Sequence, residues 1–229
     1  PKSALAAFMM GAAYVVTGSV NQSCLEAASS KHSKNLLAQA EMTDVIMAPA
    51  ADMFEMGVEL QVLKRGTLFP MRAKKLYELY KNYDSIEEIP LPDRQKLEKQ
   101  IFHNSLDQIW SKTEEYFYER DPYQIVRAKD HPKRKMALIF RWYLGLTSHW
   151  SNTGEKGRET DYQIWAGPAI GAFNNWVKGS YLEDVSKRKT VEVAWHIMTG
   201  AAYLYRLRHL QTQGISLPFT CEAYLPKPF

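Results

Sequence analysis

The 229-residue sequence has few of the patterns that identify a metal site or a hydrolytic enzyme. It contains two cysteines, Cys24 and Cys221, which are too few for a disulfide framework in a chain of this size. Neither cysteine has a metal-ligand residue at a useful spacing, and the sequence lacks a Walker loop, a GxGxxG motif and a nucleophile–base pair. We therefore expect reduced thiols and no bound metal, and the sequence gives no support to P-loop or Rossmann chemistry.

Excess charge and long apolar runs are also lacking. The formal net charge is +4, and the basic clusters at 133–135 and 187–189 are short and have no stacking platform, which argues against nucleic-acid binding. The longest apolar run, 4–16, is too short to span a bilayer, and Gly11 divides it. With 45% hydrophobic and 24% charged residues, the composition predicts a soluble, cytoplasmic, globular protein without a membrane partner.

The most informative stretch is 11–22, GAAYVVTGSVNQ. Its β-prone residues 14–16 predict a short buried strand that follows a helix ending near Gly11. The polar turn that comes next offers hydroxyl groups and an unhindered backbone where a parallel strand would meet its next helix, which is where α/β barrels hold phosphate groups. This turn consists of Thr17, Gly18 and Ser19, with Asn21 and Gln22 as further polar candidates. Taken alone, the same pattern also fits an ordinary αβα connection.

A second segment, 162–173 (YQIWAGPAIGAF), has a strand-like run and then a small-residue turn that leads into a helix. Together the two segments resemble flavin-dependent barrel enzymes of the 2-nitropropane dioxygenase and bacterial enoyl reductase type. The resemblance implies that Thr17, Gly18 and Ser19 hold the flavin phosphate and that Ala166 and Gly167 approach the flavin ring. Pro168 stands where the family pattern has glutamine, so no contact made by that amide side chain carries over.

Longer runs narrow the family. They resemble the trans-acting enoyl reductase that accompanies bacterial polyunsaturated-fatty-acid synthases and acyltransferase-less polyketide synthases, and the resemblance covers nearly all of 1–214. The runs are 16–27, 48–80, 133–145 and 161–179. The resemblance implies FMN- and NAD(P)H-dependent reduction of an enoyl thioester on an acyl carrier protein, in partnership with polyketide or fatty acid synthase components.

The expected fold class is α/β, as the C-terminal portion of a (β/α)8 TIM-type flavin barrel with a large α-helical insertion. A complete barrel of this kind needs about 250 residues before insertions, so we expect the remaining barrel segment to lie outside this chain. The expected parts are 1–67, late barrel strands and helices with the phosphate-binding turn; 68–160, a helical insertion that acts as a substrate lid; 161–214, a final flavin-facing segment and closing helix; and 215–229, an extended tail.

Helix boundaries are signalled locally. Ser105 and Gln108 have the spacing of a capping box, and Asp121-Pro122 predicts a helix that begins at the proline. A long helix is predicted over 190–213, with Gly214 as its stop signal.

The catalytic group is less well defined. His149 is the candidate proton donor, although a lone histidine more often makes a structural hydrogen bond than a catalytic one. The choice between NADH and NADPH, the substrate chain length and the oligomeric state stay open. Two other functions also remain open: a nitronate monooxygenase-like flavin oxidase, which the helical segment 68–160 argues against, and a noncatalytic docking module of a synthase complex.

Overall fold

Several helix boundaries lie where local signals predict them. In the computed structural model, which describes residues 1–228, the Ser105 side chain accepts a hydrogen bond from the backbone of Gln108 and so completes the capping box of α6 (Leu106–Arg120). Pro122 is the first residue of α7 (Pro122–Ala128), and α10 (Thr190–Thr212) ends just before Gly214. These predictions are confirmed.

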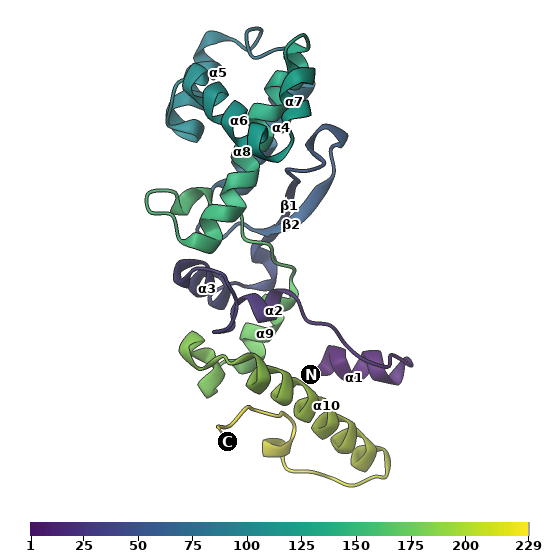
Figure 1. Ribbon diagram of the computed structural model, residues 1–229. Helices are drawn as coiled ribbons and strands as arrows, with labels where there is room; N and C mark the ends of the chain where they lie inside the picture. Colours follow the sequence, from purple (N-terminus) through teal and green to yellow (C-terminus); the bar gives the residue numbers. More distant parts are fainter. Residues whose placement is uncertain (229) are drawn as a thin grey trace. The chain divides into compact units, whose positions relative to one another are not determined.

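The described residues divide into two units (Figure 1). The continuous unit is Val45–Trp165. The split unit combines residues 1–44 with the described residues from 166 onward. The continuous unit contains β1 (Val45–Pro49), β2 (Glu59–Leu63), α4 (Phe69–Asn82), α5 (Leu91–Lys96), α6, α7 and α8 (Pro132–Thr153). The split unit contains α1 (Lys2–Met9), α2 (Ser19–Gln22), α3 (Lys31–Ala38), α9 (Ala169–Val177) and α10.

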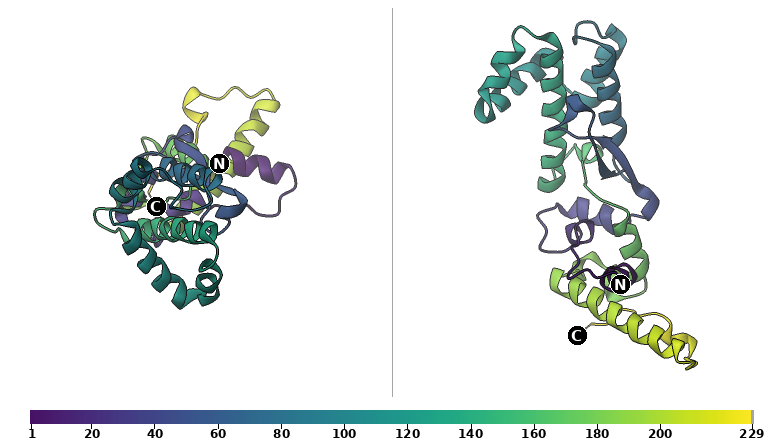
Figure 2. Two further views of the ribbon diagram at one scale, coloured as in Figure 1. Left: turned by 90° about the horizontal axis from the view of Figure 1, so that it is seen from above. Right: turned by 90° about the vertical axis from the view of Figure 1, so that its right-hand side faces the viewer.

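A two-stranded antiparallel hairpin opens the continuous unit. Strands β1 and β2 pair with Met47 opposite Gln61, and α4 packs against β1. Helix α8 packs against α4, α6 and α7, and Figure 2 shows α4 and α8 running alongside each other. The hydrophobic core lies among these elements, where Phe54 and Phe140 meet edge to face at a ring separation of 6.1 Å. This unit is therefore a helical body built against a small hairpin.

A buried carboxylate holds several parts of the continuous unit together. Asp161 is fully buried, and it accepts hydrogen bonds from Arg72, from Tyr143 Oη at 2.5 Å and from Arg158 Nη1 at 3.0 Å. Burial, reinforced by the Asp161 carboxylate, raises the pKa of Tyr143 well above its ordinary value, so the phenol keeps its proton and acts as a donor. The two guanidinium groups compensate the negative charge of the buried carboxylate and leave the cluster with a net charge of +1.

The segments at the two ends of the helical region also meet through hydrogen bonds to backbone carbonyl groups. The Thr67 hydroxyl lies 2.8 Å from the Tyr162 carbonyl oxygen and 3.0 Å from the Thr160 carbonyl oxygen, within donating distance of both. The Leu63 N–H donates to the Ile164 carbonyl at 2.9 Å. The chain thus leaves and re-enters the hairpin region at one place.

In the split unit, α9 packs closely against the segment that follows α3. Gly171 is buried, and a Cβ atom at this position would lie 2.1 Å from the backbone nitrogen of Met42. Asn174 Nδ2 donates to the carbonyl oxygens of Leu37 and Ala40, each at 2.8 Å. Gly171 and Asn174 therefore attach one side of α9 to the end of α3 and the segment that follows it. This attachment determines which residues of α9 lie on the opposite side.

The strand predicted over 14–16 is wrong for the described structure. These residues are irregular, and the side chains of Tyr14 and Val16 are 75% and 83% exposed. A parallel strand forms only where neighbouring strands satisfy its backbone groups, and the sheet of the described residues is the antiparallel pair β1–β2. The described fold is α/β, mostly helical with a small sheet.

Residues 215–228 are mostly irregular, with one 3₁₀ turn at Phe219–Cys221. The last residue of the expected tail, Phe229, lies outside the described residues. Within the described part of the chain, every helix is too short or too polar to cross a bilayer.

We expect Asp161→Asn to destabilise the protein by about 3–5 kcal/mol, because it leaves two arginines facing a neutral group in a buried site. Denaturant unfolding monitored by far-UV circular dichroism measures this change. The control is Asp93→Asn, which removes a partly exposed carboxylate 3.2 Å from the exposed Lys96 ammonium and should cost less than about 1 kcal/mol. Equal effects of the two substitutions would contradict the central role of Asp161.

We expect Gly171→Ala to destabilise the split unit by about 3 kcal/mol, because the new methyl group meets the backbone of Met42 rather than a movable side chain. Gly18→Ala is the control, since a Cβ at Gly18 meets no atom within 4 Å. Urea unfolding midpoints of the two variants provide the comparison. A midpoint for Gly171→Ala equal to that of the parent protein would show that α9 can shift at no cost.

Candidate binding pocket

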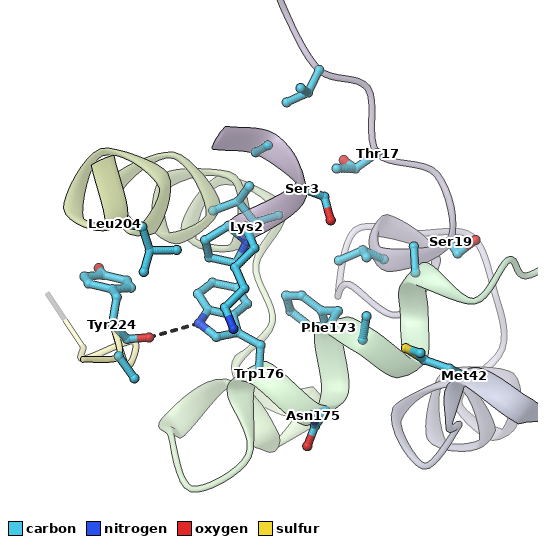
Figure 3. A pocket seen from close by; sticks show the side chains of 18 of the residues that line it. Lys2, Ser3, Thr17, Ser19, Met42, Phe173, Asn175, Trp176, Leu204 and Tyr224 are labelled. Atoms are coloured by element: carbon cyan, nitrogen blue, oxygen red, sulfur yellow. Dashed lines mark hydrogen bonds between the residues drawn. The ribbon is translucent and has the colours of Figure 1, made fainter. Parts of the chain in front are cut away.

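The split unit contains a partly open pocket of about 840 Å³ (Figure 3). Its walls come from the start of α1, the irregular segment 15–18 and the first residues of α2, and α9 and α10 supply the facing side. Residues 222–225 close one end beside Leu204. The pocket therefore joins segments that lie far apart in the sequence.

One polar part of the pocket wall is the turn that the sequence predicts as a phosphate site, and Lys2, Ser3, Asn175 and Glu222 also line the pocket. Thr17, Gly18 and Ser19 all line the wall. The Thr17 hydroxyl donates to Asn21 Oδ1 at 3.1 Å, and Asn21 Nδ2 returns a hydrogen bond to the Thr17 carbonyl at 3.0 Å. The shape of the turn is thus fixed by its own side chains.

The structure brings together the two segments on which the flavin resemblance rests. Ser19 Oγ accepts a hydrogen bond from the Gly167 N–H at 2.8 Å, across 148 positions of sequence. Because its oxygen is the acceptor in this bond, the Ser19 hydroxyl keeps its own proton for a further partner. The Gly167 N–H, in contrast, is already used.

The other predicted site residues are placed differently. Ala166 is buried, Gln22 is half-buried at the end of α2, and neither lines the pocket. His149 lies exposed on α8 in the continuous unit, where its carbonyl accepts a hydrogen bond from the Thr153 hydroxyl. Its role as a proton donor stays a prediction.

Helix α9 presents one face to the pocket. The lining residues of this face recur at helical spacing: Ala169, Ala172, Phe173 and Trp176. Trp176 Nε1 donates to the Tyr224 carbonyl at 3.0 Å, so α9 also holds the segment that closes the pocket (Figure 3). The sequence analysis did not predict that α9 forms a pocket wall, although the i, i+3, i+4, i+7 spacing of apolar residues after Pro168 indicates a helix face.

A buried cation lies beneath the pocket. Arg188 is buried with its guanidinium over the Phe173 ring, 5.1 Å from the centroid, and it donates to the Leu182 carbonyl at 2.8 Å and to Ser23 Oγ at 3.1 Å. Burial lowers the pKa of Arg188 to about 10, so the side chain is still charged at neutral pH. The basic cluster 187–189 therefore exposes its two lysines but not its arginine.

Among residues 1–228, no group of three or more His, Cys, Asp and Glu side chains is arranged to hold a metal ion.

Known proteins are similar to this chain over most of its length. The family model described as the inserted helical domain of [acyl-carrier-protein] S-malonyltransferase matches residues 83–162. One polyunsaturated fatty acid synthase polypeptide from a Thraustochytrium species is 50% identical over 100% of this chain, which corresponds to 16% of that protein. Polyketide biosynthesis protein PksE of Bacillus subtilis is 46% identical over 91% of this chain and 27% of its own length.

A solved structure shares the fold. The enoyl reductase domain of MlnA, from the macrolactin biosynthesis cluster of Bacillus amyloliquefaciens, superposes with a TM-score of 0.86 at 38% identity. The match covers 93% of this chain and 48% of that one. This chain thus spans about half of the solved domain and a smaller share of the curated relatives.

Proposed function

We propose that the protein containing this chain reduces the α,β double bond of an enoyl thioester carried on an acyl carrier protein, using FMN and NAD(P)H, during polyketide or polyunsaturated fatty acid biosynthesis. The observation that carries the proposal is the contact between Ser19 and Gly167, which joins the two flavin-like segments at the pocket. The similarity to a solved enoyl reductase domain supports the same reaction class. In this proposal, the chain is part of a flavin barrel and 68–160 is a helical lid.

The residues present fit a phosphate group at the turn. The Ser19 hydroxyl retains a proton to donate. The first residues of a helix have backbone N–H groups without intrahelical acceptors, but in this four-residue helix the N–H groups of Asn21 and Gln22 already donate to the Gly18 carbonyl, so the backbone donors would come from the residues before Asn21. Gly18 has open space where a side chain would otherwise stand, so a ligand can approach the backbone. Ser19 and the backbone would bind the phosphate of FMN, while Thr17 and Asn21 would hold the turn in shape.

The chemistry that bound FMN would supply is hydride transfer from the nicotinamide to the carbon β to the thioester carbonyl, and the α-carbon would take up a proton to complete the reduction. The task of this chain is to bind and position that group. Neither Ala166 nor Gly167 lines the pocket, so in this proposal they would contribute only through their small size and through the bond of the Gly167 N–H to Ser19 Oγ. No catalytic side chain is required for these contributions, which agrees with the lack of acid–base motifs in the sequence.

The substrate would arrive on an acidic carrier protein that docks on basic residues. Two clusters are available. Lys187 and Lys189 are exposed, and Lys189 lies 3.8 Å from Glu192. Lys133 is held more closely, because its ammonium donates to the Tyr83 carbonyl at 2.7 Å and lies 4.7 Å from the Tyr80 ring centroid. We therefore expect the exposed pair at 187 and 189 to contribute more to docking.

We expect Gly18→Val to weaken FMN binding by about tenfold or more, because the valine side chain occupies the space through which a phosphate would reach the backbone. Flavin absorbance and titration with FMN measure the loss in the whole protein. Ala13→Val adds the same kind of bulk at an exposed irregular position and should leave binding unchanged.

The reaction class is tested on the parent protein by NADPH oxidation with and without a crotonyl thioester on a carrier protein. Turnover that needs the thioester supports the proposal. Turnover that needs a nitroalkane and oxygen instead would indicate the oxidase alternative, and full flavin occupancy in Gly18→Val would reject the phosphate assignment.

We expect Lys187→Gln combined with Lys189→Gln to lower kcat/KM several-fold for the carrier-bound substrate and to weaken its dependence on salt, because exposed charges mainly set the rate of encounter. The matched substrate control is the same acyl group on coenzyme A or pantetheine, for which the variant should behave like the parent. Lys112→Gln, an exposed lysine on α6, is the control variant. Unchanged salt dependence in the double variant would move the docking site elsewhere.

A further inference from the structure

A strip of apolar side chains, here called the α9 strip, runs along the pocket face of α9. Its members are Ala169, Ala172, Phe173 and Trp176. The first and the last of them are separated by about two helical turns, so the strip is about 10 Å long at the rise of an α-helix. Ile197 and Leu204 of α10 line the same pocket. Hydrocarbon from two helices therefore borders one elongated part of the pocket.

The two large side chains of the α9 strip are held from outside the pocket. The Phe173 side chain is 5% exposed, and the guanidinium of Arg188 lies 5.1 Å from its ring centroid. Trp176 Nε1 donates to the Tyr224 carbonyl at 3.0 Å, which fixes the orientation of the indole. The strip is therefore formed before any ligand arrives, as is usual for small-molecule sites.

The shape of the α9 strip favours a flexible chain over a flat ring system. The rings of Phe173 and Trp176 lie 5.7 Å apart at an interplanar angle of 70°, so they share no common plane on which fused rings could stack. Ala169 and Ala172 are small and exposed, and they leave space beside the two rings. An alkyl chain can bend to follow such a surface.

The α9 strip also differs in chemistry from the phosphate turn. Figure 3 shows Thr17 and Ser19 on one side of the pocket and Leu204 and Tyr224 on the other, with Phe173 between them. An anionic group is stable at the hydroxyl groups of the turn but not against hydrocarbon, where it would lose its hydration without a compensating partner. A phosphate at the turn therefore leaves the strip for an apolar group.

We propose that the α9 strip binds the alkyl chain of the acyl thioester and that the small side chain of Ala172 allows long chains to enter. The identity of the ligand rests on the proposed function. The protein is then selective for enoyl groups longer than crotonyl. Each methylene group that the strip covers raises the affinity by about fourfold, until the strip is filled.

The first test measures binding without chemistry. Calorimetric titration of the whole protein with butyryl-pantetheine and octanoyl-pantetheine uses saturated thioesters, which have no double bond to reduce. We expect octanoyl-pantetheine to bind the parent protein at least about tenfold more tightly. Ala172→Phe fills the space beside Phe173 and should bring the two affinities within about threefold of each other.

The matched control is Ala202→Phe, which adds the same side chain at an exposed position of α10 that does not line the pocket. This variant should keep the affinity ratio of the parent. Ala169→Phe places the same bulk at another position of the α9 strip and tests the proposal if Ala172→Phe folds poorly by circular dichroism. Equal affinities for the two thioesters in the parent, or a parental ratio in the folded strip variants, would overturn the proposal.

The second test compares kcat/KM for octenoyl and crotonyl thioesters of pantetheine. We expect the parent protein to favour octenoyl by about tenfold or more and Ala172→Phe to lose most of this preference. A parent protein that reduces both thioesters equally well would contradict the α9 strip assignment and leave the reaction class intact. A protein that reduces neither would contradict the reaction class, while the titrations would still decide whether the strip binds alkyl chains.

Discussion

The meeting of residues 63–72 with residues 158–164 is the constraint on which the described fold depends. Between these segments the chain makes a long helical excursion, and Asp161, Arg72 and Thr67 fix the point where it returns. The entropy of closing a loop grows slowly with its length, so a long excursion costs little more than a short one once its ends are held. Because the ends meet, the segments that flank Val45–Trp165 can pack as one unit although the sequence separates them.

The sequence predicted those parts of the fold that depend on interactions between residues close together in the chain. The capping box at Ser105, the proline start of α7 and the extent of α10 rest on residues within one or two turns, and all were predictable. The pairing of Arg72 with Asp161 joins side chains 89 positions apart and leaves no local pattern. The strand expected over 14–16 failed for a related reason, because strand formation depends on partners that a local pattern does not specify.

In the candidate site, too, contacts between residues far apart in the sequence were the ones that could not be predicted. Resemblance identified the turn at Thr17–Ser19 and the segment at Gly167, and their contact through Ser19 agrees with that pairing. The burial of Arg188 has no local signal, because it stands between two lysines, yet carbonyl oxygens and the Phe173 ring hold its guanidinium in the interior. The hydrogen bond from Trp176 to the Tyr224 carbonyl joins positions that no sequence motif relates.

The exposed apolar residues beside the turn connect the fold to the proposed function. Met10, Tyr14 and Val16 are 83%, 75% and 83% exposed, although apolar side chains of this size usually cluster at a covered surface. In a parallel barrel, a strand at this position would be covered on both faces, which is also what its sequence pattern predicts. In the described structure residues 14–16 therefore form no strand and the side chains of Tyr14 and Val16 stay exposed, and the barrel environment that their sequence pattern predicts belongs to the proposed function alone.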